Sequence, residues 1–237
     1  MFEIISKIED YDKAFTIYIS QKNIDEYKLY LCWNEIADIN ILENVNFKEL
    51  KELDLQNNKI SEIKVLEKVK FEKLKKLDLS LNKISDMNIL ENVNFKELKE
   101  LYLSSNKISD IKVLEKVKFE KLEKLYLIQN DISDINILEN VNFKELKELD
   151  LSSNKITDIR VLEKVKFEKL ENLDLSENQI SDIRVLENVN FKELKELDLS
   201  SIKISDIKVL EKVKFEKLEK LNLSFNNISN NIKILKM

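Results

Sequence analysis

The stretch Leu149–Ile156, which reads LDLSSNKI, recurs nearly unchanged every 24 residues along most of the 237-residue chain. Two leucines separated by one residue place both side chains on the same face of a short strand. The Asn three residues after the second leucine marks the turn that ends this strand. Stacked copies of such a unit share one continuous core, so the period predicts a solenoid that counts as a single domain.

The period divides residues 23–237 into nine rungs. They begin at Asn23, Phe47, Phe71, Phe95, Phe119, Phe143, Phe167, Phe191 and Phe215. The strand leucines occur in all nine rungs, but Ile202 replaces the turn Asn in the eighth. We expect a weaker turn there, with Ile202 either buried or forming an adhesive spot. A second period of 48 residues alternates Lys-Val-Lys-Phe-Glu-Lys with Asn-Val-Asn-Phe-Lys-Glu, which indicates that pairs of rungs were duplicated.

The two ends of the chain depart from the period. Residues 1–22 are predicted to cap the first rung with a helix followed by a strand, because apolar residues first follow helical spacing and then alternate around Ile17. The ninth rung deviates at Asn231 and is expected to be incomplete and uncapped. An open strand edge there would permit end-to-end self-association through the C-terminal rung, and hydrogen exchange is expected to be fastest after about residue 200.

The segment Leu146–Ile159, Leu-x-x-Leu-x-Leu-x-x-Asn-x-Ile-x-x-Ile, resembles the defining stretch of the leucine-rich repeat family. The resemblance covers residues 23–237. The continuation of each repeat is similar to the 22-residue class found in phosphatase regulators and internalin adhesins, lengthened here by two residues. This resemblance implies an α/β fold: a right-handed, curved solenoid with a parallel β-sheet on its concave side and short helices or 3₁₀ turns on its convex side. It also implies a surface that binds other proteins.

The turn residues carry a structural prediction of their own. Each turn Asn can donate from its side-chain amide to backbone carbonyls of a neighbouring rung and so form a ladder. The ladder residues are Asn34, Asn58, Asn82, Asn106, Asn130, Asn154, Asn178 and Asn226. An Asp after each turn, such as Asp158, is expected to be the N-cap of the following helical turn. Because the chain has no Gly, turn positions with positive φ are expected to fall mainly to Asn and Asp.

The residue between the two strand leucines points away from the core, so the exposed face of the sheet can be listed from the sequence. Tyr102 and Tyr126 are neighbours in this column, at a strand spacing of about 4.8 Å. Large residues also replace the small or polar consensus just after some strands. The candidate partner-binding residues are Tyr30, Trp33, Leu81, Tyr102, Tyr126, Ile128, Asp150, Asp174, Asp198 and Phe225.

Each group of candidates has two interpretations. The aromatic and large apolar residues fit binding hot spots, and they equally fit drift at tolerant surface positions. The aspartates could attract a basic peptide or a cation. The residues two positions earlier alternate in charge, from Lys28 and Glu52 onwards, so that neighbours can pair across rungs. This alternation favours a solvated structural column over a recognition site.

Composition narrows the function classes. A net charge of −5 with both signs intermixed predicts no nucleic-acid binding, which needs a concentrated basic surface. The chain lacks His and Gly, and Cys32 has no His partner, so we expect no enzymatic activity, no metal site and no cofactor. No apolar run is long enough for membrane insertion. A single Cys and no secretory signal at Met1–Asp10 predict a cytoplasmic location, although a mature secreted chain would look the same.

Three functions remain open. The leading one is an interaction module that binds a protein or peptide partner on its concave face. The second is a secreted or surface adhesin or decoy of the internalin type, and the third is a structural repeat array with no dedicated partner. Whether Tyr102, Tyr126 and Trp33 engage a partner distinguishes the first two from the third.

Overall fold

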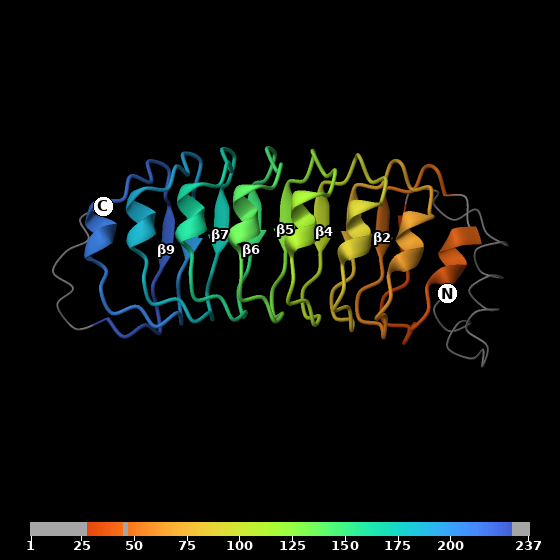
Figure 1. Cartoon of the computed structure of the whole chain (residues 1–237), viewed down its shortest axis with the longest axis horizontal. Helices are drawn as coiled ribbons and strands as arrows, with labels where there is room; N and C mark the ends of the chain where they lie inside the picture. Colours follow the sequence, from red (N-terminus) through yellow and green to blue (C-terminus); the bar gives the residue numbers. More distant parts are fainter. Residues whose placement is uncertain (1–27, 45–46, 229–237) are drawn as a thin grey trace.

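The computed structural model describes residues 28–44 and 47–228, and these form a solenoid built on one parallel sheet (Figure 1). The predicted cap at residues 1–22 and Asn231 of the ninth rung lie outside the described residues. The strands follow sequence order, and each is three residues long. They are β1 (Lys28–Tyr30), β2 (Glu52–Asp54), β3 (Lys76–Asp78), β4 (Glu100–Tyr102), β5 (Lys124–Tyr126), β6 (Glu148–Asp150), β7 (Asn172–Asp174), β8 (Glu196–Asp198) and β9 (Lys220–Asn222).

Each strand pairs with the next in a register shifted by one repeat. Leu125 of β5 lies opposite Leu149 of β6, and Tyr126 lies opposite Asp150. The middle leucine of each strand points inward, while the first and third residues point outward. The predicted parallel sheet and its inside and outside faces are therefore confirmed for the described rungs.

A row of 3₁₀ turns lies on the opposite side of the solenoid and is seen in front of the strands in Figure 1. The turns are η2 (Asn40–Asn44), η3 (Lys64–Glu67), η4 (Asn88–Glu91), η5 (Lys112–Glu115), η6 (Asn136–Glu139), η7 (Arg160–Glu163), η8 (Arg184–Glu187) and η9 (Lys208–Glu211). Between the two rows, leucines, isoleucines and the Phe that begins each rung from the second onwards form the core. Phe95, Phe119 and Phe143, for example, are almost completely buried.

The prediction that an Asp is the N-cap of each helical turn is wrong by one residue. The N-cap of η7 is Ile159, because the turn is closed by a bond from the N–H of Leu162 to the carbonyl of Ile159. Asp158 precedes this N-cap, and its Oδ1 accepts a hydrogen bond from the N–H of Arg160 at 2.9 Å. The Asp side chain thus forms an Asx-turn, which orients the chain just before the 3₁₀ turn begins.

The Asn ladder is confirmed between rungs. The Nδ2 of Asn154 donates to the carbonyl of Leu127 in the preceding rung at 2.9 Å, and also to the carbonyls of Leu151 and Ser152 in its own rung. Its Oδ1 accepts the N–H of Ile132 at 3.0 Å. One buried amide thus satisfies backbone groups of two rungs, and the pattern recurs from Asn58 onwards. Asn34 donates within its own rung, to the carbonyl of Cys32.

The expectation that positive φ falls mainly to Asn and Asp is wrong. The residue before each ladder position takes positive φ in all nine described rungs, whatever its type. These residues are Trp33, Asn57, Leu81, Ser105, Gln129, Ser153, Glu177, Ser201 and Phe225. In the first eight rungs their N–H groups bond to the next rung, as Ser153 does to the carbonyl of Ser176 at 2.9 Å. The hydrogen bonds between rungs therefore set this conformation, and local residue preference does not.

Ile202 interrupts the ladder and is completely buried, which is one of the two expected outcomes. In the preceding rungs an N–H such as that of Ile156 donates to the ladder Asn of the next rung, here Asn178. For Ile180 the corresponding acceptor position is occupied by Ile202, whose side chain offers none. Lys203 beside it also takes positive φ, at 68°. The turn at Ile202 therefore lacks one hydrogen bond of the ladder, and its weaker stability stays a prediction.

Candidate partner-binding face

The first and third residues of strands β1–β9 form one outward surface, which we call the sheet face. It corresponds to the concave face expected from the sequence. The third-residue column is Tyr30, Asp54, Asp78, Tyr102, Tyr126, Asp150, Asp174, Asp198 and Asn222. The first-residue column is Lys28, Glu52, Lys76, Glu100, Lys124, Glu148, Asn172, Glu196 and Lys220. Three-residue strands in fixed register hold these side chains on a rigid backbone.

Tyr102 and Tyr126 stack near the middle of the sheet face. Their ring centroids are 4.9 Å apart and their planes differ by 5°. The hydroxyl of Tyr102 donates to Glu100 at 2.9 Å, and the hydroxyl of Tyr126 donates to Glu148. The ammonium of Lys76 lies 4.9 Å from the centroid of the Tyr102 ring, within range of a cation–π interaction. The two rings are therefore held in place before any partner arrives.

The environment keeps both phenols protonated. Burial is the main cause that raises the pKa of Tyr102 and Tyr126, and the hydrogen bond from each hydroxyl to its Glu carboxylate raises it further. Both rings consequently stay neutral near pH 7, and both hydroxyls remain hydrogen-bond donors.

Ion pairs join neighbouring rungs along the first-residue column, as the alternation of charges predicts. Lys28 pairs with Glu52 at 2.7 Å, and Lys124 pairs with Glu148 at 2.9 Å. Glu196 pairs with Lys220 at 3.1 Å. These partly exposed pairs fix side-chain directions and add little stability each.

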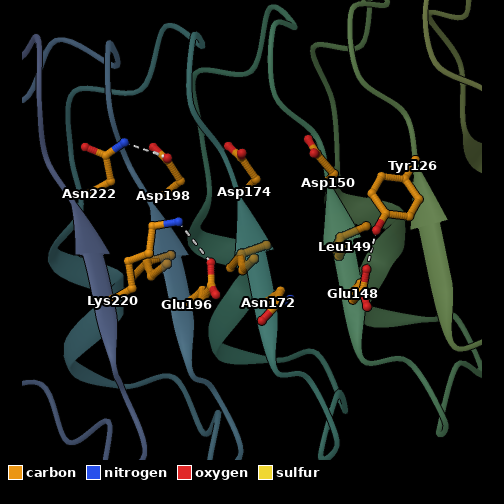
Figure 2. A pocket seen from close by; sticks show the side chains of 12 residues that line it. Tyr126, Glu148, Leu149, Asp150, Asn172, Asp174, Glu196, Asp198, Lys220 and Asn222 are labelled. Carbon is orange, nitrogen blue, oxygen red and sulfur yellow. Dashed lines mark hydrogen bonds and ion pairs between the residues drawn. The ribbon is translucent and has the colours of Figure 1, made fainter.

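A hollow of about 170 Å³ lies on the sheet face over strands β5–β9 (Figure 2). Asp150, Asp174 and Asp198 lie side by side along it on adjacent strands, with Tyr126 at one end and Lys220 at the other. Burial is the main cause that raises the pKa of Asp150 and of Asp174, and neighbouring aspartates raise it further. The floor of the hollow is therefore acidic and partly desolvated.

Serines two residues after these aspartates hold their carboxylates. Oδ1 of Asp150 accepts hydrogen bonds from the N–H and the hydroxyl of Ser152, at 2.9 and 2.6 Å. Asp198 is held in the same way by Ser200 and also accepts from the Nδ2 of Asn222 at 2.7 Å. The signal for these bonds in the sequence is the Asp-Leu-Ser spacing, which places the serine two residues after the aspartate.

The remaining candidates are not brought together. Trp33, Leu81 and Phe225 occupy the positive-φ turn position after β1, β3 and β9, with exposed fractions of 71%, 41% and 88%. Leu81 lies two repeats after Trp33, and Phe225 lies six repeats after Leu81. Ile128 is half-buried after β5, and exposed Tyr30 donates its hydroxyl to Glu52 at 3.0 Å on β1. The structure thus singles out the tyrosine pair and the aspartate row.

Three further structural observations bear on other classes of site. Among the residues that the structure describes, no group of three or more potential metal-ligating side chains comes together. No helix within the same residues has the length and apolar character needed to cross a membrane. Burial raises the pKa of the half-buried Cys32 thiol, which makes it less reactive as a nucleophile.

These features define a class of protein: a parallel-sheet solenoid with an internal Asn ladder and a rigid outward sheet face. The family model described as "Leucine Rich repeats (2 copies)" matches residues 72–116, 120–164, 144–188 and 168–212, more than half of the chain. Single-repeat models match residues 216–232 and 49–67. The chain belongs to the leucine-rich repeat family, whose repeats are typically protein-binding and non-catalytic.

Solved structures of other family members are similar to this one. An internalin (InlF) of Listeria monocytogenes is 27% identical with a TM-score of 0.63; the match covers 86% of this chain and 63% of the internalin. Internalin C2 of the same species is 23% identical with a TM-score of 0.70, over 90% and 92% of the two chains. A plant peptide hormone receptor, RGFR1 in complex with RGF2, is 21% identical with a TM-score of 0.64, over 84% and 32%. A search of curated protein sequences finds no match.

Proposed function

We propose that this protein is an interaction module whose sheet face binds a protein or peptide partner, with Tyr102 and Tyr126 as the anchor. The observation that carries the proposal is the stacked pair itself, fixed by hydroxyl bonds to Glu100 and Glu148. Aromatic side chains held rigidly lose little conformational entropy on binding, which is why they dominate binding hot spots.

Related structures support this use of the fold. The plant receptor RGFR1, whose solenoid is similar, was solved in complex with RGF2. A protein of the same fold thus forms a complex with a partner. The test uses a peptide pool that assumes nothing about the identity of the partner.

The test is selection of phage-displayed random dodecapeptides on the immobilised wild-type protein. Peptides so obtained are expected to bind Tyr102→Ala/Tyr126→Ala at least about 30-fold more weakly, as loss of a hot spot worth ~2 kcal/mol implies. Tyr30→Ala is the matched control, since it removes an exposed tyrosine from the same column at the edge of the sheet. Circular dichroism checks that each variant is folded, and Tyr102→Phe/Tyr126→Phe retains both rings.

Peptides that bind the double Ala variant as tightly as the wild type would place the binding site elsewhere. A selection that yields no peptide specific for the native protein would favour the structural array with no dedicated partner.

The similarity to internalins favours a second candidate, a secreted or surface adhesin or decoy that uses the same face. The cytoplasmic location proposed for the interaction module is supported by a lone Cys32 thiol that needs no oxidising compartment. Fractionation of cells that express the full-length open reading frame separates the two. Recovery in the cytosol supports the module, whereas recovery at the surface or in the medium supports the adhesin.

A further inference from the structure

The charge alternation of the first-residue column has one break, and it lies at the hollow. From β1 to β6 the column alternates Lys and Glu, and β8 and β9 continue with Glu196 and Lys220. At β7 the alternation requires Lys, but Asn172 stands there. Three consecutive strands, β6–β8, therefore carry acidic residues with no lysine among them.

At this break the aspartate row has no ion-pair partner among the described residues. Glu148 and Glu196 at its borders pair with Lys124 and Lys220. Within the described residues, the carboxylates of Asp150, Asp174 and Asp198 bond to hydroxyl, amide or backbone groups and form no salt bridge to a lysine or arginine. Burial and mutual repulsion raise the pKa of Asp150 and of Asp174, which is the expected response to uncompensated charge.

The stacked tyrosines supply a second, independent observation. On the β3 side of the stack, the ring of Tyr102 already carries the ammonium of Lys76 at 4.9 Å. On the β6 side, Tyr126 borders the hollow, and Figure 2 shows its ring at the end of the aspartate row. The stack thus has a cation on one side and an acidic hollow on the other. A cation in the hollow would complete a symmetrical arrangement along the sheet.

The size of the hollow fits one side-chain head group. Its volume of about 170 Å³ corresponds to about six water molecules at ~30 Å³ each. An ammonium or guanidinium group there would contact the Tyr126 ring and the nearest carboxylates at once, and partial desolvation strengthens both contacts.

We propose that the hollow between Tyr126 and Lys220 binds a lysine or arginine side chain of the partner peptide, held by Asp150, Asp174 and Asp198. This inference rests on the proposed function and specifies its partner: a cationic peptide segment that lies along strands β5–β9. The tyrosine stack is the anchor for the segment, and the aspartate row selects its charge.

The first arm of the test is the composition of the selected dodecapeptides. Peptides whose binding depends on Tyr102 and Tyr126 are expected to be enriched in Lys and Arg relative to the starting library, and their affinity is expected to fall as salt is raised.

The second arm replaces charge at constant shape. Asp150→Asn/Asp174→Asn/Asp198→Asn is expected to weaken these peptides at least about tenfold. Asn is tolerated in this column, since Asn222 makes the same bonds to Ser224 as Asp198 makes to Ser200. The matched control is Asp110→Asn/Asp134→Asn/Asp206→Asn, which removes the same charge from the 3₁₀ side of the solenoid and is expected to leave affinity within about twofold.

Asn172→Lys provides an opposite change. It restores the alternation and supplies an internal cation to the aspartate row, so it is also expected to weaken basic peptides. Tyrosine-dependent peptides without Lys or Arg enrichment would overturn the cationic partner and leave the proposed function standing. Full affinity for the triple Asn variant would overturn it as well.

Discussion

The residue before each ladder position adopts positive φ in every described rung, and none of the nine is glycine. In this region Cβ comes too close to the backbone carbonyl oxygen, so a non-glycine residue costs about 1 kcal/mol. The conformation persists because its N–H bonds to the next rung and because the Asn ladder fixes the turn. Trp33, Leu81 and Phe225 are the bulkiest residues at this position, where bulky side chains are rare.

Replacing Ser153 with Gly relieves this conflict in a middle rung. Relative to Ser153→Ala, which loses the same hydroxyl bond to Glu177, Ser153→Gly is expected to raise the free energy of unfolding by about 0.5–1 kcal/mol, measured by urea denaturation. The control is Ser152→Gly, since Ser152 lacks positive φ and its hydroxyl donates to Asp150. This control is expected to lower stability by a similar amount. A Ser153→Gly variant that is less stable than Ser153→Ala would show that the turn does not strain its side chain.

The sequence predicts the inward residues better than the turn residues for a physical reason. Burial of Leu and Ile follows from the strand period alone, and the structure confirms it. The positive-φ position depends on a hydrogen bond to a residue 23 positions later, as from Ser153 to Ser176, and local preferences carry no trace of it. The neighbouring tyrosines were predictable, but the Glu partners of their hydroxyls depend on side-chain rotamers.

At the scale of the strands, Glu123 joins three consecutive rungs. It precedes β5 and accepts from Lys99 in the preceding rung at 2.5 Å and from Lys147 in the following rung at 2.8 Å. The bond from Lys147 is the main cause that lowers the pKa of Glu123 to about 2, followed by the bond from Lys99. The carboxylate therefore stays ionised in the folded protein at a pH where the unfolded chain binds a proton.

Acid should reveal this contribution. Because the folded pKa is lowered, the stabilisation by Glu123 is complete above the unfolded pKa of about 4.5 and is lost as the pH falls toward 2. Glu123→Gln is expected to unfold at lower urea at pH 7 and to lose less further stability between pH ~4.5 and ~2. Glu120→Gln, an exposed change in the same rung, controls for net charge. Identical pH profiles for wild type and Glu123→Gln would contradict the assignment.

The sequence predicts the alternating charges on the strands, but it does not predict the hollow. The alternating charges were visible and favoured a solvated structural column. Most of the described column follows that interpretation, since Glu52 and Glu148 pair as expected. Only the structure shows that the break at Asn172 coincides with a hollow beside the tyrosine stack, because a volume depends on how side chains pack.

At the scale of the whole molecule, the 48-residue period sets opposite charges next to each other. The third residue of each rung alternates Glu and Lys from Glu49 onwards, and the pairs bond across rungs at 2.5–2.6 Å. These pairs are Glu49–Lys73, Glu97–Lys121, Glu145–Lys169 and Glu193–Lys217. The unit that preserves every such neighbour relation is therefore two rungs.

Deletions test this unit. Removing residues 119–142 would place Glu97 beside Glu145 and Lys99 beside Lys147, whereas removing residues 119–166 would place Glu97 beside Lys169 and Lys99 beside Glu171. Each like-charged neighbour is expected to cost about 0.2–1 kcal/mol. The longer deletion is therefore expected to unfold at a urea concentration no lower than the shorter one, although it has one rung fewer.

The salt dependence is the control for this prediction. The disadvantage of the shorter deletion should shrink in high salt, because these charges are partly exposed and screened. A shorter deletion that is clearly more stable than the longer one at low salt would contradict the two-rung unit.

Trp33 is the single tryptophan of the chain and lies largely exposed in the first described rung, far from the tyrosine stack on β4 and β5. Its indole already contacts water in the folded state, so its fluorescence emission should change little when the core melts. A denaturation curve recorded by tryptophan emission would therefore show little or no unfolding transition. The same emission should shift when a ligand covers Trp33 near β1, because binding removes water from its indole.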